Sequence, residues 1–252
     1  MKKESSKTYE VIDVCLLAGK IMLVSGAETY RVEDTMARIA ASFGMENSHS
    51  FVMPTGIIFS IDGSDPSKLV RVTERTTDLS KVAKVNNISR QISEGKLTLQ
   101  QAYDELIYLD QKKEMYPYWL QIIAAAISSG CFMIMFQGVW SDFPYAVIAG
   151  GLGFCCLLYM QHLLKLKFFA EFSAAFVIGV VSLLFVYVGL GQELDKIIIG
   201  SVMPLVPGLL ITNAVRDLIA GHLISSISKG AEAFLTAFAI GAGIAIAISF
   251  SI

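Results

Sequence analysis

The second half of the chain contains five apolar runs, each about as long as a helix that crosses a membrane. They lie near residues 117–139, 144–164, 169–190, 197–215 and 231–250. A helix needs roughly 20 apolar residues to cross the hydrocarbon core of a bilayer. Residues 117–252 hold 11 of the 42 charged residues, whereas residues 1–116 hold 31. The sequence therefore predicts a transmembrane all-α domain of five helices over 117–252, preceded by a small soluble domain over 1–116.

The fourth apolar run is interrupted by two prolines, Pro204 and Pro207, and Gly208 follows the second of them. Each proline lacks an N–H and leaves a carbonyl one turn earlier without its helical partner. In lipid, such backbone groups are tolerated only where protein or a water-filled cavity satisfies them. The run is therefore predicted to be a broken transmembrane helix that lines a solute pathway.

Four polar residues follow the break: Thr212, Asn213, Arg216 and Asp217. Their spacing of three and four residues brings Asn213 beside the charged pair and Thr212 beside Arg216 on a helix. The N-terminus of a half-helix that opens after the second proline attracts a carboxylate. Arg216 can hold a second carboxylate or pair with Asp217. In the alternative interpretation, these residues only lock a kinked helix to its neighbours.

Two more carboxylates stand near the starts of apolar runs, Glu171 in the third run and Glu232 in the fifth. A carboxylate inside a membrane is costly, so it is expected to face a cavity or a partner. Both residues are predicted to belong to the pathway. In the alternative, each lies near enough to the interface to reach water.

The first 116 residues are typical of a small α+β domain, because three- to four-residue periods alternate with two-residue periods. Ser25 and Glu28 have the spacing of a capping box, which predicts that a second helix begins there. Strands are predicted within 49–61 and 69–75, and further helices are predicted to begin at Asp78 and Thr98. In the same segment, Glu28, Arg31 and Glu33 are candidates for a cytoplasmic gate; the alternative is a solvated helix face with local ion pairs.

The distribution of lysine and arginine predicts the orientation in the membrane. Lys165, Lys167, Arg216 and Lys229 lie in loops on the same side as the N-terminal domain, whereas Lys196 alone lies in the opposite loops. This asymmetry predicts a multi-pass protein of the plasma membrane with a cytoplasmic N-terminus and an external C-terminus. No signal peptide is apparent at the start.

Several function classes have no support in the sequence. The three histidines are scattered, and no Cys-x-x-Cys spacing occurs, so no metal site, cofactor or catalytic residue is predicted. A net charge of −2 without a basic stripe gives no sign of nucleic-acid binding. The absence of a Gly-x-x-x-x-Gly-Lys-Ser/Thr loop leaves the proton gradient as the expected energy source.

Three segments resemble the threonine/serine exporter family. They are Gly26-Ala-Glu-Thr-Tyr-Arg-Val-Glu-Asp-Thr-Met36, Met53-Pro-Thr-Gly56 and Pro204-Leu-Val-Pro-Gly-Leu-Leu-Ile-Thr-Asn-Ala-Val-Arg-Asp217, with Glu232-Ala233 in the following run. The resemblance implies a cytoplasmic domain and five spans that work with a second set of about five spans. That second set is fused in some members and a separate small protein in others, one such pair being a succinate exporter. Because this chain stops after the first set, it resembles the larger subunit of a split pair.

The expected function is that of a subunit of a bacterial plasma-membrane efflux transporter. It would export threonine and serine or a dicarboxylate such as succinate, driven by protons, and it is not expected to be an enzyme. Its expected partners are the lipid bilayer, the small carboxylate substrate and a second five-span subunit, with further copies of itself as an open possibility. The alternative is a membrane-tethered regulatory subunit, or an enzyme whose chemistry lies in the cytoplasmic domain.

Overall fold

The computed structural model of the chain describes residues 2–61, 67–112, 116–164 and 166–250, and the side chains from residue 8 onward. The chain packs into two compact units, each described by itself below. The first consists of Met1–Glu114 and Leu210–Gly230, and the second of Met115–Leu209 and Ala231–Ile252. The division into domains 1–116 and 117–252 stays a prediction. Lys165, which contributed to the orientation argument, lies outside the described residues.

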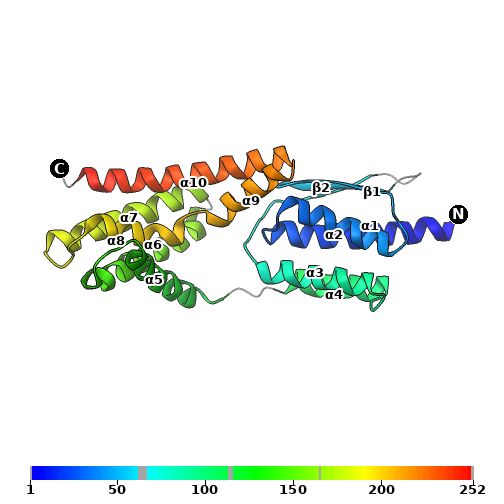
Figure 1. The fold of residues 1–252 in the computed structure, drawn as a ribbon, viewed down its shortest axis with the longest axis horizontal. Helices are drawn as coiled ribbons and strands as arrows, with labels where there is room; N and C mark the ends of the chain where they lie inside the picture. The colour runs from blue at the N-terminus through cyan, green and yellow to red at the C-terminus, as the bar shows by residue number, and fades with distance from the viewer. Residues whose placement is uncertain (1, 62–66, 113–115, 165, 251–252) are drawn as a thin grey trace. The chain divides into compact units, whose positions relative to one another are not determined.

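The N-terminal part of the first unit is an α+β structure, as the sequence predicts, with a small sheet on one side of four helices; Leu210–Gly230 adds most of α9 (Gly208–Ile219) and the start of α10 (Leu223–Ser249). The helices are α1 (Lys2–Val24), α2 (Thr29–Ser42), α3 (Leu79–Ser93) and α4 (Leu99–Gln111), and the strands are β1 (Ser48–Met53), β2 (Gly56–Ile61) and β3 (Lys68–Arg71). The strands pair antiparallel in the order β1-β2-β3. Helices α1 and α2 lie between the sheet and the pair α3 and α4 (Figure 1).

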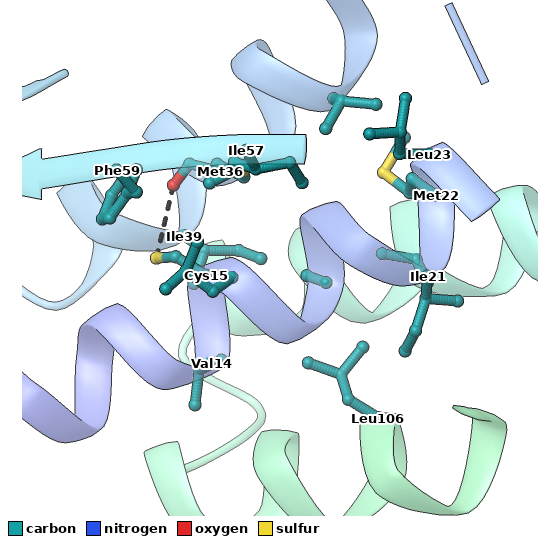
Figure 2. Packing of buried hydrophobic residues seen from close by; sticks show 14 of the residues in the cluster. Val14, Cys15, Ile21, Met22, Leu23, Met36, Ile39, Ile57, Phe59 and Leu106 are labelled. Carbon is teal, nitrogen blue, oxygen red and sulfur yellow. Dashed lines mark hydrogen bonds between the residues drawn. The ribbon is translucent and has the colours of Figure 1, made fainter. Parts of the chain in front are cut away.

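The core of this unit lies where α1 and α2 meet the sheet. Ile57, Phe59 and Ile61 alternate along β2, and all three are buried because this strand turns one face to the helices. Figure 2 shows Cys15 of α1 within the same cluster, its Sγ directed at the carbonyl oxygen of Met36 at 3.5 Å. Burial raises the pKa of the Cys15 thiol to about 12, so this cysteine is a neutral core side chain.

Two of the predicted helix starts in the first unit are confirmed and one is wrong. Asp78 caps α3, and Thr98 forms a complete capping box with Gln101 at the start of α4. The capping box predicted for Ser25 and Glu28 does not form. Helix α2 begins at Thr29 with Glu28 as its N-cap residue, and the Glu28 side chain makes no capping hydrogen bond. Interactions with distant residues occupy this side chain instead, as shown below.

The remaining helices are predominantly apolar. They are α5 (Tyr118–Met135), α6 (Phe143–Leu164), α7 (Lys167–Tyr187), α8 (Leu194–Val202), α9 (Gly208–Ile219) and α10 (Leu223–Ser249), with single turns η1 (Trp140–Asp142) and η2 (Met203–Leu205). Helices α8 and α9, with 9 and 12 residues, are much shorter than the others. Within the described ranges, four helices are long and apolar enough to cross a membrane. The bent pair formed by α8 with η2 and by α9 would be a fifth span. The predicted break is confirmed, since helical structure stops after Leu205 and resumes at Gly208.

Small residues bring the helices of the second unit close together. A Cβ built on Gly200 of α8 would lie 2.7 Å from the backbone nitrogen of Met133 in α5. A Cβ on Gly153 of α6 would lie 2.3 Å from a side-chain carbon of Ile178 in α7. By contrast, a Cβ on Gly241 of α10 would meet nothing within 4 Å.

These distances predict opposite effects for the same substitution at two helical glycines. Gly200→Ala is expected to destabilise the protein by roughly 1–3 kcal/mol, because the methyl group collides with the Met133 backbone. Gly241→Ala is the matched control and is expected to be neutral or to stabilise the helix by up to about 1 kcal/mol. Thermal denaturation of both purified variants in detergent measures the difference. A Gly200→Ala protein as stable as the control would contradict the packing described here.

Candidate functional site

Helix α9 carries the four polar residues that follow the break, and it divides them between two faces. Asn213 and Asp217 are buried in the first unit, whereas Thr212 and Arg216, one turn apart, are exposed. Asn213 donates a hydrogen bond from Nδ2 to the carbonyl oxygen of Gly26 at 2.9 Å. The α9 face with Asn213 and Asp217 is therefore fixed against the turn between α1 and α2, whereas the face with Thr212 and Arg216 is accessible.

Asp217 forms the centre of a fully buried polar cluster with Thr29 and Lys229. Its Oδ1 accepts the backbone N–H of Thr29 at 2.9 Å, and its Oδ2 accepts the Thr29 hydroxyl at 2.9 Å and the Lys229 ammonium at 2.7 Å. Lys229 Nζ also lies 3.3 Å from Thr29 Oγ1. The Asp217 and Lys229 side chains are 0% and 5% exposed. Such a buried pair is tolerated only when its remaining groups are hydrogen-bonded, as they are here.

The same carboxylate caps helix α2 from a distant part of the sequence. Thr29 is the first residue of α2, so its N–H has no acceptor within the helix. Asp217, 188 residues away in the sequence, supplies that acceptor and places a negative charge at the positive end of the helix. The interaction replaces the local capping box that the sequence predicts.

Two glycines in left-handed conformations make this arrangement possible. Gly26, with φ of +90°, reverses the chain after α1 and presents its carbonyl oxygen to Asn213. Gly221, with φ of +86°, ends α9, and the N–H of His222 then bonds the carbonyl of Asp217 at 2.8 Å. The turn at Gly221 returns the chain into α10, which brings Lys229 to Asp217.

Glu28 lies between two arginines. Its Oε1 accepts a hydrogen bond from Arg216, and its Oε2 accepts one from Arg31 at 3.2 Å. The Glu28 side chain is 7% exposed, whereas that of Arg216 is 60% exposed. Burial by itself raises the pKa of Glu28, but hydrogen bonds from its own N–H, from Arg216 and from Arg31 together hold that pKa below its ordinary value. Glu28 is therefore an ionised carboxylate held by two guanidinium groups.

Glu33 belongs to a neighbouring set of contacts. Its Oε1 accepts the backbone N–H of Val52 at 3.0 Å, and its Oε2 lies 3.8 Å from Nε2 of His222. Burial raises the pKa of Glu33, and the nearby charge of Asp217 adds to the rise, while Val52 and His222 oppose it. Ser225 Oγ donates to the carbonyl oxygen of Val52 at 3.2 Å, so the start of α10 is attached to β1.

The structure brings most of the sequence-predicted residues of the two sets together in the first unit. Arg216 of the predicted pathway contacts Glu28 of the predicted gate, so these two sets of residues are in direct contact. Arg216 and Asp217 do not pair with each other, because each has a different partner. The predicted residues that lie in the second unit, or in the break itself, are Pro204, Pro207, Gly208, Glu171 and Glu232.

Two members of the site, Thr29 and Lys229, are not among the site residues that the sequence predicts. In the sequence, Lys229 contributes only a positive charge beside the membrane, because the fifth apolar run is predicted to begin after it. Only the structure shows that α10 begins at Leu223, which places Lys229 within the helix between the small residues Ser228 and Gly230. No local signal marks Thr29 either, since only the fold brings its N–H to Asp217.

Comparison with known proteins gives a consistent set of relatives. A family model described as "Putative threonine/serine exporter" matches residues 13–251. The chain is 24% identical over 237 residues to a "Probable threonine/serine exporter" of Mycobacterium tuberculosis, over 91% of this chain and 44% of that protein. It is 25% identical over 252 residues to a "Probable succinate transporter subunit YjjP" of Klebsiella aerogenes, over 99% of this chain and 97% of that protein.

A third relative is the protein of the same name from Escherichia coli, which is 23% identical over 98% of this chain and 96% of its own length. The chain thus spans less than half of the mycobacterial relative and almost the whole length of the other two. No solved structure gives a significant match.

Proposed function

This chain belongs to the threonine/serine exporter family, and we propose that it is a subunit of a plasma-membrane efflux transporter for a small carboxylate-bearing metabolite. The substrate class is threonine and serine or a dicarboxylate such as succinate, as the names of the relatives suggest. One observation carries the proposal. Arg216, exposed on the helix that follows a broken apolar run, holds a carboxylate, that of Glu28.

Arginine suits this task because its planar guanidinium presents paired donors that match the two oxygens of a carboxylate. In the structure, Glu28 pairs with Arg216 and Arg31, and in this proposal that arrangement corresponds to a closed gate. A substrate carboxylate that binds Arg216 replaces Glu28 there, and Glu28 keeps Arg31 as a partner. The exchange leaves no buried charge without a counter-ion, so it avoids the main cost of opening a buried ion pair.

The buried cluster of Asp217, Thr29 and Lys229 has a different task in this proposal. It joins the start of α2 to α9 and α10 through hydrogen bonds of 2.7 to 2.9 Å. It therefore fixes the backbone from which Arg216 and Glu28 approach each other. Positioning of this kind supports recognition, because a binding group must be held in place before the ligand arrives.

A second subunit of the same family is part of the proposal. Two relatives that this chain covers almost completely are named as subunits, whereas the mycobacterial relative is more than twice as long as the matched part. We infer that a separate membrane protein supplies the remaining spans, and that the proton gradient drives export.

Efflux from vesicles tests this function. Vesicles loaded with labelled threonine and labelled succinate are prepared with this chain, with the candidate second subunit, and with both. We expect release of one of the two substrates only when both proteins are present. Strong efflux by this chain alone would remove the second subunit from the account. If vesicles with both proteins release neither substrate, the proposed efflux function itself is contradicted.

The proposed orientation gives a separate prediction. An alkaline phosphatase domain is active only outside the cytoplasm, so fusion after Ser249 is expected to give an active enzyme. Fusion after Lys167, the first residue of α7, is expected to give an inactive one. Fusion protein levels, measured by immunoblot, control for expression. The reverse pattern of activities would overturn the assignment of a cytoplasmic N-terminus and an external C-terminus.

A further inference from the structure

A second polar cluster lies within the second unit, between α7 and α10. Lys167 and Glu171 are one turn apart on α7, and Glu232 and Thr236 are one turn apart on α10. Lys167 Nζ pairs with Glu232 Oε1 at 2.7 Å, and these two side chains are 46% and 20% exposed. Glu171 and Thr236 are 6% and 1% exposed. The cluster thus has an accessible ion pair at one end and a buried carboxyl and hydroxyl at the other.

The buried end of the cluster is unsatisfied. Thr236 is close enough to act on the Glu171 carboxyl, yet neither Glu171 Oε2 nor Thr236 Oγ1 has a partner at hydrogen-bond geometry among the described residues. An ionised carboxylate in this situation is very unfavourable, and it avoids the cost by taking up a proton. Binding of a proton to Oε2 turns this acceptor into a donor.

The charge balance of the cluster also favours a protonated carboxyl. Lys167 is one ammonium shared by two carboxylates, so the cluster carries a charge of −1 unless one carboxyl is protonated. Since Lys167 is paired with Glu232, Glu171 is the carboxyl of the cluster that takes up the proton.

The charged residues on the other helices of the second unit do not alter the charge balance of this cluster. Helices α5 and α6 contain no Asp, Glu, Lys or Arg, and His162 at the end of α6 is exposed. On α8, Asp195 lies 3.8 Å from Lys196, its own neighbour in the sequence. Asp142 of η1 accepts the N–H groups of Gln192 and Glu193, and the Glu193 carboxylate accepts the N–H of Val139. The charged groups that act on Glu171 are therefore Lys167 and Glu232.

Close packing of α7 and α10 keeps this end of the cluster dry. A Cβ on Gly243 of α10 would lie 2.4 Å from the carbonyl oxygen of Phe172, the residue after Glu171. Ala170 and Ala174 of α7 are fully buried in the same contact region, which also includes Ile240 of α10. A carboxyl in such surroundings changes its charge only when the two helices separate.

We propose that Glu171 is the site that binds the coupling proton, with Thr236 and the Lys167–Glu232 pair as its surroundings. This inference rests on the proposed function and names the proton site of that transporter. With the proton on Oε2, the cluster is neutral and the helices pack closely. When α7 and α10 separate, water that enters accepts the proton from Oε2, and Lys167, one turn away, becomes the counter-ion of both carboxylates.

The test uses vesicles with this chain and the second subunit. Glu171→Gln, which imitates the protonated carboxyl, is expected to lose efflux driven by a pH gradient. Exchange of labelled for unlabelled substrate at equal pH on both sides is expected to persist. Asp195→Asn removes an exposed carboxylate of the same unit and serves as the control, with both activities unchanged. Efflux of Glu171→Gln that still follows the pH gradient, or wild-type efflux that follows a sodium gradient instead, would overturn the proton site.

A second measurement separates the proton site from transport. Infrared spectra of the purified protein are expected to contain the carbonyl band of a protonated carboxylic acid, which is lost in Glu171→Gln and displaced in Glu171→Asp. Glu171→Asp keeps a carboxyl, so the same measurement can be made on this variant if Glu171→Gln does not insert into the membrane. If Glu171→Gln loses the band but the wild-type protein transports neither substrate, Glu171 binds a proton but the proposed function, and with it the coupling role, is contradicted. A band that is unchanged in both variants would contradict the proton site alone.

Discussion

Replacement of Lys229 by methionine is expected to lower the free energy of unfolding of the first unit by about 3–5 kcal/mol. Methionine fills much of the space of the lysine stem but leaves the Asp217 carboxylate buried with only Thr29 as its partner. A loss of this size removes most of the stability of a marginal domain, which lies at the lower end of about 5–15 kcal/mol. Thermal denaturation in detergent and the yield of monodisperse protein measure the effect.

Two further variants test whether the unpaired buried carboxylate causes the loss of stability in Lys229→Met. Lys20→Met removes a lysine from a partly exposed pair with Asp110 at 3.0 Å, and it is expected to cost less than about 1 kcal/mol. Combining Lys229→Met with Asp217→Asn removes both buried charges, while the asparagine oxygen still accepts the Thr29 N–H. The combined variant is expected to recover most of the lost stability. If Lys229→Met alone is as stable as the wild type, the buried pair does not have the role given to it here.

Arg216→Lys is expected to reduce transport by roughly tenfold to a hundredfold while the protein still inserts and folds. Lysine keeps the charge but loses the planar pair of donors that fits a carboxylate. Hydrogen bonds to charged groups contribute about 1.5–3 kcal/mol, which corresponds to the expected loss of affinity. Substrate exchange in vesicles with equal amounts of inserted protein measures the change.

Arg38→Lys is the matched control for this variant. Arg38 pairs with Asp34 one turn away on the surface of α2, so the same substitution there is expected to leave transport unchanged. Wild-type exchange kinetics in Arg216→Lys would assign Arg216 to anchoring beside the membrane and would contradict its role in substrate recognition.

Local sequence signals predicted much of the fold. The apolar runs, the interruption at Pro204 and Pro207, and the caps at Asp78 and Thr98 depend on neighbouring residues, and the structure contains all of them. These features are predictable because hydrophobic periodicity and capping act over a few residues. The number of spans stays between four and five, since the bent pair can be one span or two half-helices.

The site was only partly predictable, because its contacts join residues far apart in the sequence. The spacing of Ser25 and Glu28 favours a local cap, but the arginines take the Glu28 carboxylate and Asp217 takes over the cap of α2. Position along the sequence gave no indication that Lys229 would be buried. The contact of the predicted gate with the predicted pathway, that of Glu28 with Arg216, depends on the tertiary structure, as does the contact of Thr29 with Asp217.

The most direct test of the central claim is a comparison of substrate binding by the wild type, Glu28→Gln and Arg216→Lys, each purified with the second subunit. If Glu28 occupies the arginine that receives the substrate carboxylate, Glu28→Gln should bind threonine or succinate more tightly than the wild type, because the competing charge is gone. Arg216→Lys should bind the same substrate more weakly. Equal affinities in all three proteins, or weaker binding in Glu28→Gln, would contradict a carboxylate site at Arg216.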